Sequence, residues 1–148
     1  MRRSYILLAV AAFAALAACT AGRHSSSGFR LPDTGNTERG KAVFIATGCA
    51  ACHRVAGAET PAPTVTPVVP VVLGGDITVE MTDGYLVTSI INPSHRLAAY
   101  PRTQIIENGK SRMPVYAENL SVRDLTDLVA FLQSHYTVRN VRSAYSTF

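Results

Sequence analysis

The sequence predicts an all-α domain with one small β-hairpin. Residues that commonly cap a helix stand at 36–37, 82–83 and 121, and apolar residues at 125, 128, 129 and 132 recur with the spacing of one helix face. Two β-prone stretches, 71–73 and 77–79, lie on either side of two glycines and predict the hairpin. A chain of 148 residues is expected to form a single folded domain.

The first 18 residues have the pattern of an export signal. A basic start, Met1-Arg2-Arg3, precedes an apolar run over residues 6–18, which is shorter than the roughly 20 residues that cross a bilayer as a helix. The run ends in Leu16-Ala17-Ala18-Cys19, which resembles a bacterial lipobox. This resemblance implies cleavage before Cys19, attachment of lipid to its side chain, and a protein held on a membrane surface that faces the periplasm or the cell exterior. An ordinary signal peptide with a chance cysteine is the alternative.

The residues that follow the cysteine predict an anchor and a tether. Thr20 is not the aspartate associated with retention at the inner membrane, which favours the outer membrane in a host with two membranes. Residues 20–36 are rich in Ser, Gly and Thr, so residues 19–36 are predicted to form a lipid anchor and a flexible tether. Removal of Arg2 and Arg3 leaves twelve Lys and Arg against ten Asp and Glu, and this near-neutral balance predicts no nucleic-acid partner.

A short motif directly after the first predicted helix carries the chemistry. The helix is expected over residues 37–48, and Cys49-Ala50-Ala51-Cys52-His53 follows it. Two cysteines three apart, with histidine after the second, have the spacing of c-type haem attachment. Each thiol can add to one vinyl group of haem, and the turn then places His53 under the same porphyrin face as an iron ligand. The motif therefore predicts one covalent haem.

Two other kinds of site fit this motif less well. A zinc site needs a second ligand pair, but His24, His95 and His135 stand singly, and Cys19 is already assigned to lipid. A thioredoxin-type redox pair follows a strand, whereas residues 41–48 predict helix. With lipid on one cysteine and haem on two, no free thiol remains.

The rest of the domain is predicted from turn and cap residues. Prolines at 61, 63, 67 and 70 exclude helix between residues 60 and 73. Helices are expected over 84–91, ended by Asn92-Pro93, and over 103–107, ended by Asn108-Gly109. Ser121-Val122-Arg123-Asp124 resembles a capping box at the start of the last helix. Residues 137–148 form a tail, for which a frayed end, a longer helix and contact with a partner all remain open.

The order of these motifs resembles that of class I cytochromes c. The likeness covers residues 37–136 and consists of Gly40-xxx-Phe44, the Cys49–His53 motif, Met113-Pro114 and the last amphipathic helix. It implies the cytochrome c fold, with helices wrapped around one haem c and the first helix crossing the last one at the glycine. The aromatic residue expected at that crossing is Phe131, with Tyr136 as second choice. The hairpin is similar to insertions in the cytochrome c domains fused to some haem-copper oxidase subunits.

The same resemblance implies the haem contacts. Cys49 and Cys52 would attach the haem, while His53 and Met113 would be the two axial ligands of its iron. In the family, a proline carbonyl accepts a hydrogen bond from the ligand histidine, and Pro63 is the nearest match, with Pro61 as rival. His95 and Met81 compete with Met113 as the second iron ligand. The alternative role for Met113 itself is that of a methionine that packs in the core.

These ligands imply an electron-transfer protein rather than an enzyme. Histidine and methionine together raise the reduction potential of haem iron and leave no vacant position for a substrate. The expected role is one-electron transfer between a donor and an acceptor redox protein. Two alternatives remain: a haem subunit of a larger reductase or oxidase, and, if Met113 is not an iron ligand, a peroxidase-like enzyme or a gas sensor.

Overall fold

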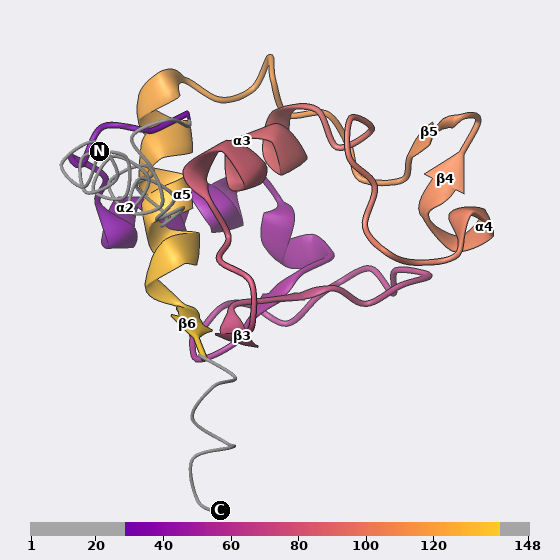
Figure 1. The fold of residues 1–148 in the computed structure, drawn as a ribbon, viewed down its shortest axis with the longest axis horizontal. Coiled ribbons are helices and arrows are strands. Elements are labelled where there is room, and N and C mark those ends of the chain that lie inside the picture. The colour runs from indigo at the N-terminus through magenta and orange to yellow at the C-terminus, as the bar shows by residue number, and fades with distance from the viewer. Residues whose placement is uncertain (1–28, 140–148) are drawn as a thin grey trace, which may run out of the picture.

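The computed structural model describes residues 29–139, which form a mainly helical domain with short strands (Figure 1). In chain order the elements are α2 (Thr37–Ala46), the 3-10 helix η1 (Cys49–Ala51), β1 (Arg54–Val55), β2 (Val72–Leu73), β3 (Gly75–Ile77), α3 (Asp83–Ile91), α4 (Arg102–Ile105), β4 (Ile106–Glu107), β5 (Lys110–Ser111), α5 (Val122–Ser134) and β6 (Tyr136–Val138). None of the helices within these residues is long and apolar enough to cross a membrane.

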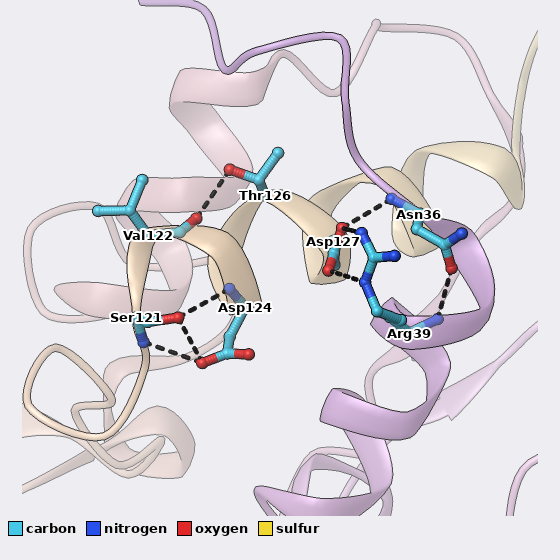
Figure 2. Close-up of polar contacts among 7 residues, drawn as sticks. All are labelled: Asn36, Arg39, Ser121, Val122, Asp124, Thr126 and Asp127. Carbon is cyan, nitrogen blue, oxygen red and sulfur yellow. Dashed lines mark hydrogen bonds and ion pairs between the residues drawn. The ribbon is translucent and has the colours of Figure 1, made fainter.

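The main helices begin where the sequence predicts. The Asn36 side chain caps α2 by accepting a hydrogen bond from the backbone N–H of Arg39 at 2.8 Å. At the start of α5, the Ser121 hydroxyl accepts from the Asp124 N–H at 3.1 Å, and the Asp124 carboxylate accepts from the Ser121 N–H at 3.1 Å (Figure 2). This is the predicted capping box, and it satisfies two of the backbone donors that a helix leaves unpaired at its start.

The crossing of α2 and α5 forms the centre of the domain. A Cβ placed on Gly40 would lie 2.0 Å from the Asp127 carbonyl oxygen and 2.6 Å from the Phe131 Cβ, so only glycine allows the two backbones to come this close. The rings of Phe44 and Phe131 meet with centroids 5.7 Å apart, and both side chains are buried. The predicted helix crossing and its aromatic residue, Phe131 rather than Tyr136, are therefore confirmed.

A buried carboxylate ties the two helices together beside this crossing. Asp127 is 2% exposed, and its oxygens accept from the Asn36 N–H at 2.7 Å and from the Arg39 Nε at 2.8 Å (Figure 2). The Arg39 guanidinium and the Asn36 N–H hold the pKa of Asp127 below its usual range, because both stabilise the charged form. Asp127 therefore stays ionised and keeps the start of α2 on α5.

The end of the predicted tether is packed against the domain. We call residues 29–36 the N-terminal arm. Leu31 is buried, and its N–H donates to the Asp83 carboxylate at 3.2 Å. A Cβ on Gly35 would lie 2.6 Å from the Ala130 Cβ on α5. The prediction that flexibility extends to Asn36 is therefore wrong for residues 31–36, because two buried carboxylates give the arm hydrogen-bond partners. Residues 19–28 lie outside the described part of the chain.

The predicted hairpin over residues 71–79 is also wrong. β2 pairs in parallel with β1, and β3 pairs in parallel with β6, so β2 and β3 do not pair with each other. Only Gly74 separates the two strands, which leaves no room for a two-residue hairpin turn. A Cβ on Gly74 would lie 3.0 Å from the His135 carbonyl oxygen, which shows that the glycine serves a close approach to the end of α5.

The first residues of the predicted tail belong to the fold. Residues 136–138 form β6, the Arg139 N–H donates to the Ile77 carbonyl at 2.8 Å, and the Arg139 side chain pairs with Asp76 at 2.7 Å. The fold therefore continues past the expected boundary at 136, and a frayed end is not observed before residue 140. Residues 140–148 lie outside the described part.

The hairpin within the described residues is β4–β5, further along the chain than predicted. The helix expected over 103–107 is shorter, since α4 ends at Ile105 and β4 begins at Ile106. Asn108 and Gly109 have φ angles of 49° and 76°, which fit the two central positions of a type I′ turn. Asn108-Gly109, which was expected to end a helix, thus forms the turn of a hairpin.

Candidate haem-attachment site

The Cys49–His53 motif forms one tight turn directly after α2. Gly48, at φ 80°, reverses the chain, and η1 then begins at Cys49. The N–H groups of Cys52 and His53 both donate to the Cys49 carbonyl, at 3.2 and 2.9 Å. The turn thus brings two thiols and one imidazole together, which is the donor set that covalent haem attachment needs.

The His53 imidazole is held by the proline-rich segment. Its Nδ1 lies 3.1 Å from the Val71 carbonyl oxygen. A carbonyl can only accept, so Nδ1 carries the proton in this hydrogen bond and Nε2 is left with a free lone pair. Nε2 has no hydrogen-bond partner within residues 29–139. A fixed ring with one nitrogen open is the arrangement of a histidine ready to ligate a metal.

The acceptor is Val71, so the prediction of Pro63, and of its rival Pro61, is wrong. The register of the β1–β2 ladder explains the difference. Arg54 pairs with Val72, and this pairing brings the residues just before them, His53 and Val71, side by side. The segment that holds Pro61 and Pro63 reaches the motif elsewhere: the Val65 N–H donates to the Ala51 carbonyl at 3.0 Å. A backbone carbonyl supports His53 as expected, but it belongs to another residue.

The Cys49 thiol sits half-buried beside α2. Its sulfur lies 3.3 Å from the Thr47 hydroxyl, which itself donates to the Val43 carbonyl at 2.7 Å. Because the Thr47 proton is used in that bond, the Cys49 S–H is the donor to Thr47. Burial raises the pKa of the Cys49 thiol, so it is kept as a neutral thiol. Cys49 and Cys52 are not joined in a disulfide, and both sulfurs are free to form thioethers.

A later loop, which carries Met113, packs against the same core as the attachment turn. The pKa of Tyr116 is raised, chiefly because its hydroxyl is partly buried. Tyr116 also packs against the buried core. Met113 stands three residues earlier with a half-buried side chain. Cys49 packs against the same core, so the loop that carries Met113 and the attachment turn share part of the interior.

The two competitors of Met113 are placed differently. His95 lines a hollow of about 250 Å³ along α3, together with Tyr85 and Arg96, and no residue of the 49–53 turn lines this hollow. The Arg96 guanidinium lies 5.4 Å from the centroid of the Tyr85 ring. Met81 packs against the core, and its carbonyl accepts from the Gln133 side chain. The packing role predicted for Met81 is consistent with this position.

Three valines that are adjacent in the chain to residues of this region, or bonded to the turn, keep about half or more of their surface exposed. Val65, Val72 and Val115 are 51%, 59% and 56% exposed. Val65 bonds to Ala51, Val72 follows the His53 acceptor, and Val115 precedes Tyr116. Uncovered valine is unfavourable at roughly 25 cal/mol for each Å² of apolar surface, so a flat apolar group at this site would be stabilised by covering it. The donor set and these exposed apolar side chains together fit haem.

Comparison with known families decides between the possible meanings of this site. A family model for cytochrome c matches residues 37–135. The chain belongs to the cytochrome c family. This membership confirms the cytochrome c fold and haem c as the cofactor, and it gives this cytochrome c a haem electron-carrier role with redox partners. No curated protein and no solved structure matches the chain. The wrapping of the helices around the haem stays a prediction.

Sequence reasoning missed three residues of this cytochrome c site: Thr47, Val71 and Tyr116. Val71 carries no local signal, because its role comes from the register of β1 and β2, which are far apart in the sequence. Thr47 is also hidden, since a threonine at the end of a helix usually only caps it. Tyr116 could have been considered from the sequence, because it stands only three residues after the predicted ligand Met113 on the same loop.

Proposed function

We propose that this cytochrome c is a membrane-anchored carrier of one electron at a time between two redox proteins outside the cytoplasm. The observation that supports it most is the His53 ring, held at Nδ1 by Val71 and open at Nε2, on the same turn as two free thiols. Cys49 and Cys52 would hold the haem, and His53 would ligate its iron from one side. When bound, haem supplies an iron that changes oxidation state by one electron with little rearrangement.

Met113 is proposed as the second iron ligand. It stands three residues before Tyr116, which packs against the same core as Cys49, and its thioether is a soft, uncharged donor. If His53 and Met113 both held the iron, it would have no open position for a substrate, which supports electron transfer over substrate chemistry. His95, which lines a separate hollow along α3, is the weaker choice.

Replacing Met113 by alanine is expected to abolish the weak near-infrared charge-transfer band of the ferric, haem-loaded protein. That band is typical of haem iron ligated by methionine sulfur, and it disappears when the sulfur is removed. The variant is also expected to have a lower reduction potential and to bind added imidazole, because one axial position becomes open. Optical spectra and redox titration measure both effects.

Met81→Leu is the matched control, because it changes the methionine that packs against the core. It should keep both the band and the potential. A wild-type protein without the band, or a Met113→Ala variant that retains it, would exclude Met113 as ligand. The open-site alternative, a peroxidase-like enzyme or gas sensor, would then be favoured.

The membrane anchor is proposed from Leu16-Ala17-Ala18-Cys19, which lies outside the described residues. Two or more acyl chains on Cys19 would hold the protein stably at a membrane surface. The variant Cys19→Ser is therefore expected to shift nearly all of the protein from the membrane fraction to the soluble fraction. Cell fractionation and the mass of the N-terminal peptide measure this. A Thr20→Ser control should stay with the membrane, and a Cys19→Ser protein that does the same would contradict the anchor.

A further inference from the structure

Met113 stands two residues after the end of the β4–β5 hairpin, which lies at the opposite end of the molecule from the α2–α5 pair (Figure 1). Ile106 pairs with Ser111 and Glu107 with Lys110, so each strand is only two residues long. A hairpin this short is marginal on its own in water. Its ion pair, Arg112 to Glu107 at 3.4 Å, is exposed and adds little. The position of the hairpin therefore depends on other contacts.

Two serine hydroxyls supply such contacts in series. The Ser111 N–H donates to the Ser94 Oγ at 3.0 Å, and the Met113 N–H donates to the Ser111 Oγ at 3.2 Å. Ser94 stands three residues after the end of α3, next to the buried Pro93. The Arg112 N–H is held as well, by the Ile105 carbonyl at 2.9 Å. Every backbone N–H from residue 111 to residue 113 thus has a defined partner.

We infer that Ser111 and Ser94 position Met113 so that its sulfur stays on the iron. This inference rests on the proposed function, in which Met113 is an axial ligand. Met113 has three rotatable side-chain bonds and a neutral sulfur, so its ligation is weak and depends on how well its backbone is held in place. Fixing the Met113 N–H before ligation reduces the conformational freedom that is lost when the sulfur binds. Ser111 does this directly, and Ser94 fixes Ser111.

A competition experiment on the full-length, haem-loaded ferric protein tests this role. Imidazole competes with Met113 for the iron, so its apparent dissociation constant reports how strongly Met113 is held. Ser111→Ala is expected to lower this constant about fivefold, which corresponds to the loss of one hydrogen bond of about 1 kcal/mol. Ser94→Ala is expected to lower it by about twofold, since it acts through Ser111. Ser111→Thr keeps the hydroxyl and should behave like the wild type.

A control separates positioning from general stability. The Ser134 hydroxyl donates to the Phe131 carbonyl at 2.7 Å at the end of α5. Ser134→Ala removes a hydroxyl hydrogen bond far from the hairpin and should leave the imidazole constant unchanged, whereas Ser111→Ala changes the constant.

The two possible failures can be told apart. If the wild type shows the near-infrared band but Ser111→Ala and Ser111→Thr bind imidazole equally well, the serine role is wrong and Met113 remains the ligand. If the wild type lacks the band, the proposed function is wrong and the serine role with it. An equal effect of Ser134→Ala and Ser111→Ala on the constant would also overturn the role of Ser111.

Discussion

Gly40→Ala is expected to destabilise the domain by about 3 kcal/mol, at the upper end of the cost of adding a methyl group to a packed interior. The new Cβ would lie 2.0 Å from the Asp127 carbonyl oxygen and 2.6 Å from the Phe131 Cβ. One of these atoms belongs to the backbone of α5 and cannot turn aside, so the helices must move apart. Their separation would loosen the Phe44–Phe131 contact and the Arg39–Asp127 ion pair together.

A loss of stability in Gly40→Ala is informative, because helix propensity alone predicts that alanine would stabilise α2 at this position. In an exposed helix, alanine is favoured over glycine by about 1 kcal/mol. Ala42→Gly, at an exposed position of α2, is therefore the matched control and should lose about that much. Thermal or denaturant unfolding of the haem-loaded proteins measures both. If Gly40→Ala were as stable as the wild type, the close crossing of α2 and α5 would be wrong.

The double variant Cys49→Ala, Cys52→Ala is expected to lose cooperative unfolding. Without the two thiols no haem can be attached, and Val65, Val72 and Val115 stay more than half exposed. The sequence has no tryptophan, and a core built from about 100 residues is marginal without added apolar mass. Folding of this domain is therefore expected to depend on its cofactor, as folding of small metal-binding domains depends on the metal.

Circular dichroism against temperature measures this dependence. The double variant should show reduced helix content and a broad, shallow change instead of a sigmoidal transition. Cys19→Ser, which changes the third cysteine, is the control and should melt like the wild type. A sharp transition with native helix content in the double variant would show that the polypeptide folds without haem.

The parts of the fold that could be predicted are those with local causes. Asn36 and Ser121 predict the starts of α2 and α5, because each side chain accepts a hydrogen bond from the backbone N–H three residues later. Gly40 and Phe44 lie one helical turn apart, and the resemblance to cytochromes c supplied their partner, Phe131. The attachment motif is local too, since its spacing within five residues determines its turn.

The parts that could not be predicted depend on pairings between distant segments. β3 joins β6 across some 60 residues, and nothing near Gly75 indicates that its partner is Tyr136 rather than β2. The same holds for Val71, which meets His53 only because β1 and β2 align in one register. The flexibility predicted for the N-terminal arm is wrong for a related reason. Its polar composition is typical of a flexible segment, but the distant carboxylates of Asp83 and Asp127 accept hydrogen bonds from its backbone.

The docking of the N-terminal arm bears on how the domain would respond to a pull. If the chain is held at a membrane through Cys19, tension along it reaches the domain first at the Leu31–Asp83 hydrogen bond and then at the Asn36–Asp127 hydrogen bond. Those bonds pass the load into α3 and α5. The His53–Val71 contact lies off this route, so the attachment turn would be shielded from movements of the anchor while these bonds hold.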